Sequence, residues 1–103
     1  MIARSEAHRR IEEEIRREKA AALGRAGERL EEAHREAMSA LERVEGTRDP
    51  RERDRLVAEY EAARARVVTA RLALMIQREA IGLRHHGVVD QLFPEPPRHA
   101  RPR

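Results

Sequence analysis

The spacing of apolar residues between Arg53 and Leu83 constrains this chain more than any other feature. Most of them stand three or four positions apart, which is the period of one face of an α-helix rather than of a strand. This first row consists of Leu56, Tyr60, Ala63, Val67, Ala70, Leu74 and Ile81. A second apolar row beside it consists of Val57, Val68, Leu72, Met75 and Ile76. One neighbouring helix can cover one row, so the second row predicts a further packing partner for this helix.

Another long helix is predicted over residues 5–45, with Ser5 as its N-cap. From Leu23 onward its apolar residues alternate in steps of three and four, which is the heptad rhythm of a coiled coil. The predicted core row is Ile11, Ile15, Ala22 or Leu23, Ala26, Leu30, Ala33, Ala37, Leu41 and Val44. On the other faces, acidic residues often stand four positions before basic ones, as in Glu31 and Arg35, which is typical of a solvated helix surface.

Residues 46–49 carry the signals of a tight turn between these two helices. Gly46 can adopt the left-handed conformation that ends a helix. Asp49 is suited to cap the next helix, Pro50 to occupy its first position, and Glu52 to complete a capping box. A connection this short places the helices antiparallel. The predicted facing pairs are Leu41 with Leu56, Ala37 with Tyr60, Ala33 with Ala63, Leu30 with Val67, Ala26 with Ala70, and Leu23 with Leu74.

The second helix of this hairpin is predicted over about residues 50–85, and the residue that ends it stays open between Gly82 and Gly87. Residues 88–93 predict a short helix that Pro94 stops. Residues 94–103 contain four prolines and no apolar period, so extended or disordered chain is expected there. We therefore expect an all-α fold, with one helical-hairpin domain over residues 1–93 and a Pro/Arg-rich tail over residues 94–103.

Composition limits the classes of function. Of the 103 residues, 40% are charged, and acidic and basic side chains interleave to a net charge of +3. Cysteine is absent, which excludes disulfides, thiolate catalysis and thiolate metal sites. No stretch approaches the roughly 20 apolar residues that cross a bilayer, and no signal-peptide pattern is visible. A cytoplasmic protein without a membrane partner is expected.

Two segments carry a resemblance to known proteins. Residues 18–30 read EKAAALGRAGERL, and residues 75–83 read MIQREAIGL. They resemble the AAxLGRxGxxLE helix and the QREAxGLR segment of an uncharacterised bacterial family of small all-α proteins, a domain of unknown function. The matching positions are Ala21, Ala22, Leu23, Gly24, Arg25, Gly27, Leu30 and Glu31, then Gln77, Arg78, Glu79, Ala80, Gly82, Leu83 and Arg84. The bulky aromatic residue expected just before the second segment is missing. The resemblance implies an all-α fold and no particular activity.

A polar patch is predicted where the second of these segments faces the first long helix. Gln77 occupies a core-row position close to Lys19, Arg78 and Glu79 flank it, and Arg25 lies one to two turns away. A buried amide with an ion pair can set the register of two helices, as one polar core residue does in coiled coils. The alternative is a pocket for an anionic ligand.

Candidate chemistry in the sequence is weak. Glu31 and His34 share one helix face in the ExxH spacing of di-iron bundles, but no carboxylate stands opposite them. His85 and His86 point about 100° apart on a helix, so with His99 they favour incidental histidines over a metal site. No catalytic triad, phosphate loop or paired-carboxylate cleft is visible. We expect a non-enzymatic protein without a metal or cofactor.

The unpaired second row leads to the functional hypothesis. A second hairpin could cover Val57, Val68, Leu72, Met75 and Ile76 and form a four-helix bundle. We expect a homodimeric structural or protein-interaction module whose C-terminal tail could bind a protein partner. If the chain were monomeric, either its own C-terminal segment or a different partner would have to cover the row. The alternative function is a small basic nucleic-acid-associated protein, because the sequence pI is about 10.4.

Overall fold

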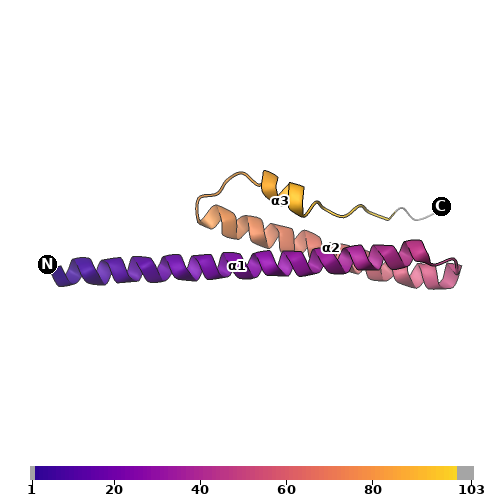
Figure 1. Ribbon diagram of the computed structural model, residues 1–103, viewed down its shortest axis with the longest axis horizontal. Coiled ribbons are helices and arrows are strands. Elements are labelled where there is room, and N and C mark those ends of the chain that lie inside the picture. The colour runs from indigo at the N-terminus through magenta and orange to yellow at the C-terminus, as the bar shows by residue number, and fades with distance from the viewer. Residues whose placement is uncertain (1, 100–103) are drawn as a thin grey trace.

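A computed structural model describes the backbone of residues 2–99 and the side chains of residues 5–99, and it is an all-α hairpin as predicted. Helix α1 spans Ile2–Gly46 and α2 spans Pro50–Ala80, and the two lie antiparallel. A short helix, α3, spans Gly87–Leu92, and the chain then runs in extended form back along the hairpin (Figure 1). The molecule is a rod of 74 × 21 × 18 Å. Residues 2–99 contain no strand.

Helix α1 extends well beyond the end of α2, which corrects two predictions. It begins at Ile2, so Ser5 lies inside the helix and is not its N-cap. Helix α1 has 45 residues and α2 has 31, so the first turns of α1 project past the hairpin (Figure 1). Ile11 and Ile15 are therefore exposed, not core residues as the periodicity predicted.

The turn between α1 and α2 confirms Asp49 as the N-cap of α2. The predicted capping box is not formed directly, because Thr47 links its two ends. The Asp49 carboxylate accepts a 3.1 Å bond from the Arg51 N–H, and Pro50 begins the helix. Glu52 does not reach back to the Asp49 N–H. That N–H donates to the Thr47 hydroxyl at 3.3 Å, and the hydroxyl donates to the Glu52 carboxylate at 3.3 Å. Thr47 therefore stands between the two groups that a capping box joins directly.

The end of α2 is a Schellman motif built on Gly82. The Leu83 N–H donates to the Arg78 carbonyl at 2.9 Å and the Gly82 N–H donates to the Glu79 carbonyl at 3.0 Å, which is the paired pattern of that motif. Gly82 has φ of 92°, and no other residue of the described chain has positive φ. Of the two glycines proposed to end this helix, Gly82 does so, and the last helical residue, Ala80, lies five residues before the predicted end at about residue 85. Gly46 instead lies in the last turn of α1 with helical φ, so its predicted left-handed role is wrong.

Replacing Gly82 with Val should therefore destabilise the protein by about 1–2 kcal/mol, the cost of placing an L-residue in the left-handed region. Replacing Gly46 with Val is the matched control, since Gly46 lies in α1 without positive φ and Val has a higher helix propensity than Gly, so no loss is expected there. Neither glycine has an atom within 4 Å of the added Cβ, so steric clash does not confuse the comparison. Thermal melting of both variants measures the difference. Equal losses would contradict the assignment of Gly82.

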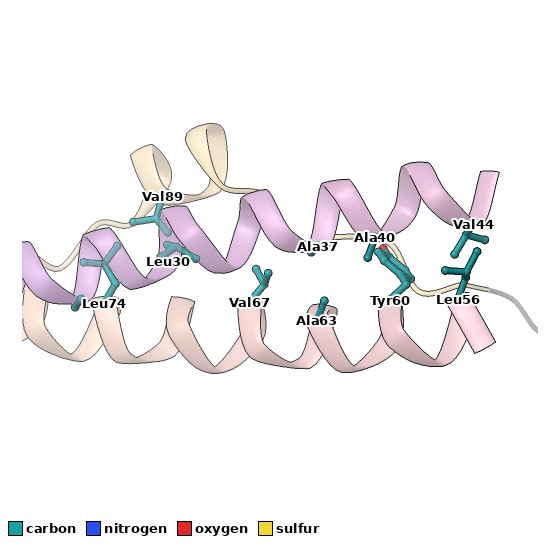
Figure 2. Close-up of a cluster of buried hydrophobic side chains, with 11 residues drawn as sticks. Leu30, Ala37, Ala40, Val44, Leu56, Tyr60, Ala63, Val67, Leu74 and Val89 are labelled. Atoms are coloured by element: carbon teal, nitrogen blue, oxygen red, sulfur yellow. The ribbon is translucent and has the colours of Figure 1, made fainter. Parts of the chain in front are cut away.

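The core is a single layer of side chains between α1 and α2, closed at one side by α3. Its members are Ala26, Leu30, Ala37, Ala40, Val44, Leu56, Tyr60, Ala63, Val67, Leu74 and Val89. In Figure 2, Val44 and Leu56 point toward one another and Ala40 lies beside Tyr60. These pairs differ by about one helical turn from the predicted ones, which joined Leu41 to Leu56 and Ala37 to Tyr60. The reason is that side chains lean toward the N-terminus of their own helix, so side chains that meet are not those at equal backbone height.

Candidate interaction surfaces

Residues 83–99, here called the strap, return along α2 and are held there by side chains of that helix (Figure 1). Arg64, Arg71 and Arg78 stand seven positions apart, so they share one face of α2. Each donates one hydrogen bond to a backbone carbonyl of the strap and another to a strap side chain. The side chains of Arg64 and Arg71 are only 13% exposed.

Arg71 binds the strap at α3. It donates to the backbone carbonyl of Phe93, and its Nη2 lies 2.6 Å from Oδ1 of Asp90. The two bonds come from one planar guanidinium, so they fix both the position and the direction of the strap at this point. Charge-assisted bonds of this kind are stronger than neutral ones, and this pair is partly shielded from water.

The extended part of the strap is bound by Arg64 and Tyr60, which lie closer to the hairpin tip than Arg71. Arg64 Nε donates to the Pro96 carbonyl at 2.9 Å, and its Nη2 contacts the Glu95 carboxylate at 3.1 Å. The Tyr60 hydroxyl donates to the Pro97 carbonyl. Pro96 itself is buried. The tail is therefore packed on the hairpin from Pro94 to His99 as extended chain, which is the first of the two predicted alternatives. Residues 100–103 lie outside the described chain.

Arg78 and Glu79 hold the loop that leads into the strap. Arg78 donates to the His85 carbonyl at 2.9 Å and to Nδ1 of His86 at 3.3 Å. His86 Nε2 lies 3.1 Å from the Glu79 carboxylate. With the proton on Nε2, both ring nitrogens of His86 have partners of the right kind.

Two apolar side chains complete the attachment of the strap. Val89 of α3 is buried above Leu30 and Leu74 (Figure 2). The Phe93 ring meets the His34 ring of α1 edge to face, with centroids 5.6 Å apart. The strap therefore contacts both helices of the hairpin. The two aromatic side chains of this protein, Tyr60 and Phe93, both serve this attachment.

The predicted interface residues divide into two groups. Val57 and Met75 are partly buried and pack against the chain's own core, so they are not free for a partner. Val68, Leu72 and Ile76 are 38%, 60% and 55% exposed. The chain therefore covers part of its second apolar row itself and leaves the rest in contact with solvent.

These three residues belong to a larger surface, here called the outer face of α2. It faces away from α1, all of its residues are exposed, and none is charged. Its members are Ala58, Ala62, Ala65, Val68, Thr69, Leu72, Ala73, Ile76 and Ala80. Sequence reasoning missed the alanines of this face because it included alanines in the first row of α2 and only bulky residues in the second. The steps of three and four from Ala58 to Ala80 were the signal that could have revealed them.

The predicted polar patch does not form one site. Arg78 and Glu79 face the strap, as described above, and not α1. Gln77 is partly buried, whereas Arg25 is exposed. Within residues 5–99, no hydrogen bond or ion pair joins Arg25 to the other three. Two of the four residues therefore attach the strap, and neither an anion pocket nor a register-setting pair is assembled.

The residues considered as metal ligands have other contacts in the structure. Glu31 contacts Arg35 at 3.5 Å, and His34 is stacked against Phe93. His86 is engaged by Arg78 and Glu79, while the backbone N–H of His99 donates to Glu61 at 2.8 Å. Over the described residues there is no cluster of three or more His, Asp or Glu side chains that could hold a metal ion.

The chain was compared with protein-family models, curated proteins and solved structures. No family model, no curated protein and no solved structure matches the chain. The bacterial resemblance carried by residues 18–30 and 75–83 therefore stays a prediction. None of the helices within residues 2–99 combines the length and the apolar character that a membrane crossing requires.

The strap contact of Tyr60 predicts a pH effect. Burial of the phenol, followed by the nearby Glu61 carboxylate, raises the Tyr60 pKa above its ordinary value of 10.0. The folded state therefore holds this proton more tightly than the unfolded state, so stability is unaffected by this group below pH 10 and falls as the pH rises through the raised pKa. Urea unfolding between pH 8 and pH 11 measures the decline. Tyr60→Phe, which cannot ionise, should show a smaller decline, and equal slopes would contradict the effect.

Proposed function

We propose that this chain is a non-enzymatic interaction module that self-associates through the outer face of α2. The observation that supports this proposal is the exposure of an uncharged helix face in a chain where 40% of residues are charged. Seven positions in steps of three and four from Ala58 to Ala80 carry no charged side chain, and Glu61 and Glu79 lie at the edge of this stripe beside Val68. Such a stripe is unusual for a solvated helix, which normally carries charged and polar residues on its outer side.

Two sides of helix α2 are covered within the chain, and a third, uncharged side is not. Helix α1 packs on the first and the strap on the second. The third side is the outer face, which spans 23 residues, or about 35 Å of helix. Covering Val68, Leu72 and Ile76 would contribute about 1.5–3 kcal/mol for each side chain that becomes fully buried.

A second copy of the chain fits this face because the face is self-complementary. An antiparallel pairing of two α2 helices around Thr69 places Ala62 opposite the partner's Ile76 and Ala65 opposite the partner's Ala73. Ile76 then meets a small side chain, Leu72 faces the partner's Arg66, and the alanines allow close approach of the helices. The same patch serves both copies, as a two-fold interface requires. Because the outer face points away from α1, two hairpins joined in this way place four helices side by side, with α2 and its copy at the centre and one α1 on each outer side.

The hairpin tip offers less support for nucleic-acid binding. Arg53 donates to the Thr47 carbonyl at 2.8 Å. Arg55 contacts the carboxylates of Glu52 at 3.8 Å and Glu59 at 2.8 Å. These guanidiniums are directed to acceptors of the chain itself, whereas a phosphate-binding surface presents a continuous basic face. We therefore place self-association first.

Light scattering of the unaltered protein at tens of micromolar tests the proposal. The chain has a mass of 11.9 kDa, so the expected result is twice that mass. A mass equal to one chain at this concentration would contradict self-association through the outer face.

A further inference from the structure

The contacts of the strap show what the surface beneath it recognises. Arg64, Arg71, Arg78 and Tyr60 donate to the backbone carbonyls of Pro96, Phe93, His85 and Pro97. Every peptide has carbonyl groups, so this part of the recognition does not depend on the sequence of the strap. Prolines favour the extended backbone that presents such carbonyls outward, and they lack an N–H that would need a partner of its own.

Three features of the surface do select for sequence. An apolar site between Leu30 and Leu74 receives Val89. Beside it, Arg71 and Arg64 pair with the carboxylates of Asp90 and Glu95. The His34 ring receives the aromatic ring of Phe93. Together they describe a peptide with an aliphatic residue, an acidic residue directly after it, an aromatic residue three positions later, and then prolines and a second acid.

The strap is attached more loosely than the helices of the hairpin. Of its 17 residues, only Val89 and Pro96 are buried, and Val88 and Leu92 are exposed although they are apolar. It joins α2 through Ile81 and Gly82, and Gly82 has positive φ. A segment with few buried side chains and many polar contacts opens at lower free energy than the core that it covers.

We propose that the surface beneath the strap is a peptide-binding groove, occupied in cis by the strap and in trans by an acidic, proline-containing segment of another protein. The strap then acts as an intramolecular competitor. A tethered segment has an effective concentration on the order of millimolar, so a partner peptide of similar affinity binds only when the strap is displaced. This groove lies on a different side of α2 from the outer face, so the proposal does not depend on self-association.

Fluorescence anisotropy with a labelled synthetic peptide of residues 86–99 tests the groove. The receiving protein is the full chain carrying Val89→Asp, which places a carboxylate in the apolar site and releases the strap. We expect this variant to bind the peptide with an affinity at least about tenfold higher than that of the unaltered chain, because the tethered competitor is removed. Adding Arg71→Gln should weaken binding by about tenfold or more, the loss expected for charge-assisted hydrogen bonds.

Two controls keep the result interpretable. Arg66→Gln removes an exposed arginine of α2 that contacts Glu36 and not the strap, and it should leave peptide binding unchanged. Asp90→Arg is a second way to release the strap, since it opposes Arg71 at an exposed position and leaves the hairpin core intact. Circular dichroism confirms that each variant keeps the helicity of the unaltered chain.

Three outcomes would overturn the proposal. The first is no peptide binding at about 1 mM to either strap-released variant when both are helical. The second is equal binding of a scrambled peptide, or equal effects of Arg71→Gln and Arg66→Gln. The third is a dimer that Val89→Asp dissociates and substitutions on the outer face do not, because the groove would then belong to the strap of a second copy.

Discussion

The double variant Ala65→Glu/Leu72→Glu is expected to be monomeric at concentrations where the unaltered chain is a dimer. Both residues lie on the outer face of α2, and Leu72 is 60% exposed in the single chain. In a two-fold interface each substitution occurs twice, so the dimer loses two leucine contacts and gains four carboxylates that must leave water. We expect the dissociation constant to rise at least about a thousandfold, which corresponds to about 4 kcal/mol.

Light scattering after size-exclusion chromatography measures this change. Ala21→Glu is the matched control, because it makes the same substitution at an exposed position of α1, away from the outer face of α2. The control should remain a dimer. The double variant should keep its helicity, since both positions are exposed in the single chain. If the double variant and the unaltered chain have the same mass, the outer face is not the interface.

The second large effect is expected for Tyr60→Ala. Tyr60 is the largest of the fully buried side chains and has no exposed surface. Removing a large buried ring costs about 3–5 kcal/mol, because apolar contacts are lost and a cavity remains. The Pro97 carbonyl also loses the donor that holds the strap. A chain of this length should lose roughly 4–8 °C of melting temperature per kcal/mol, so a decrease of more than about 12 °C is expected.

Tyr60→Phe separates the ring from the hydroxyl. It keeps the packing of the ring and removes one hydrogen bond, which contributes about 1 kcal/mol. Thermal unfolding followed by circular dichroism, at one fixed protein concentration, compares the three proteins. If Tyr60→Ala melts no lower than Tyr60→Phe, the ring does not contribute the packing that its burial indicates.

The sequence by itself was sufficient for the hairpin, because the signals for it are local. The period of Leu56, Tyr60 and Val67 depends only on the geometry of one helix. Asp49 and Pro50 act on the first turn of α2, within a few residues of their own position. Each of these signals can be read without knowing where any distant part of the chain lies.

Only the tertiary structure shows how far α2 extends along α1 and which residues of the two helices face one another. Ile11 and Ile15 have the period of core residues, but α2 ends before it reaches them. Gly82 and Gly87 were both suitable ends for α2, and the backbone bonds of Leu83 and Gly82 distinguish them. Periodicity reports which side of a helix is apolar, and it does not report what stands opposite.

The attachment of the strap to α2 is visible only in the tertiary structure. Arg64, Arg71 and Arg78 are three of many arginines in the sequence, and their spacing of seven is equally compatible with a solvated face. Their acceptors are backbone carbonyls of the strap, and the donor and acceptor for Arg64 are 32 residues apart. A carbonyl group has no residue-specific signature in a sequence. The attachment therefore becomes visible only when the chain is folded, because only then does a distant backbone lie within hydrogen-bond distance of the guanidinium groups.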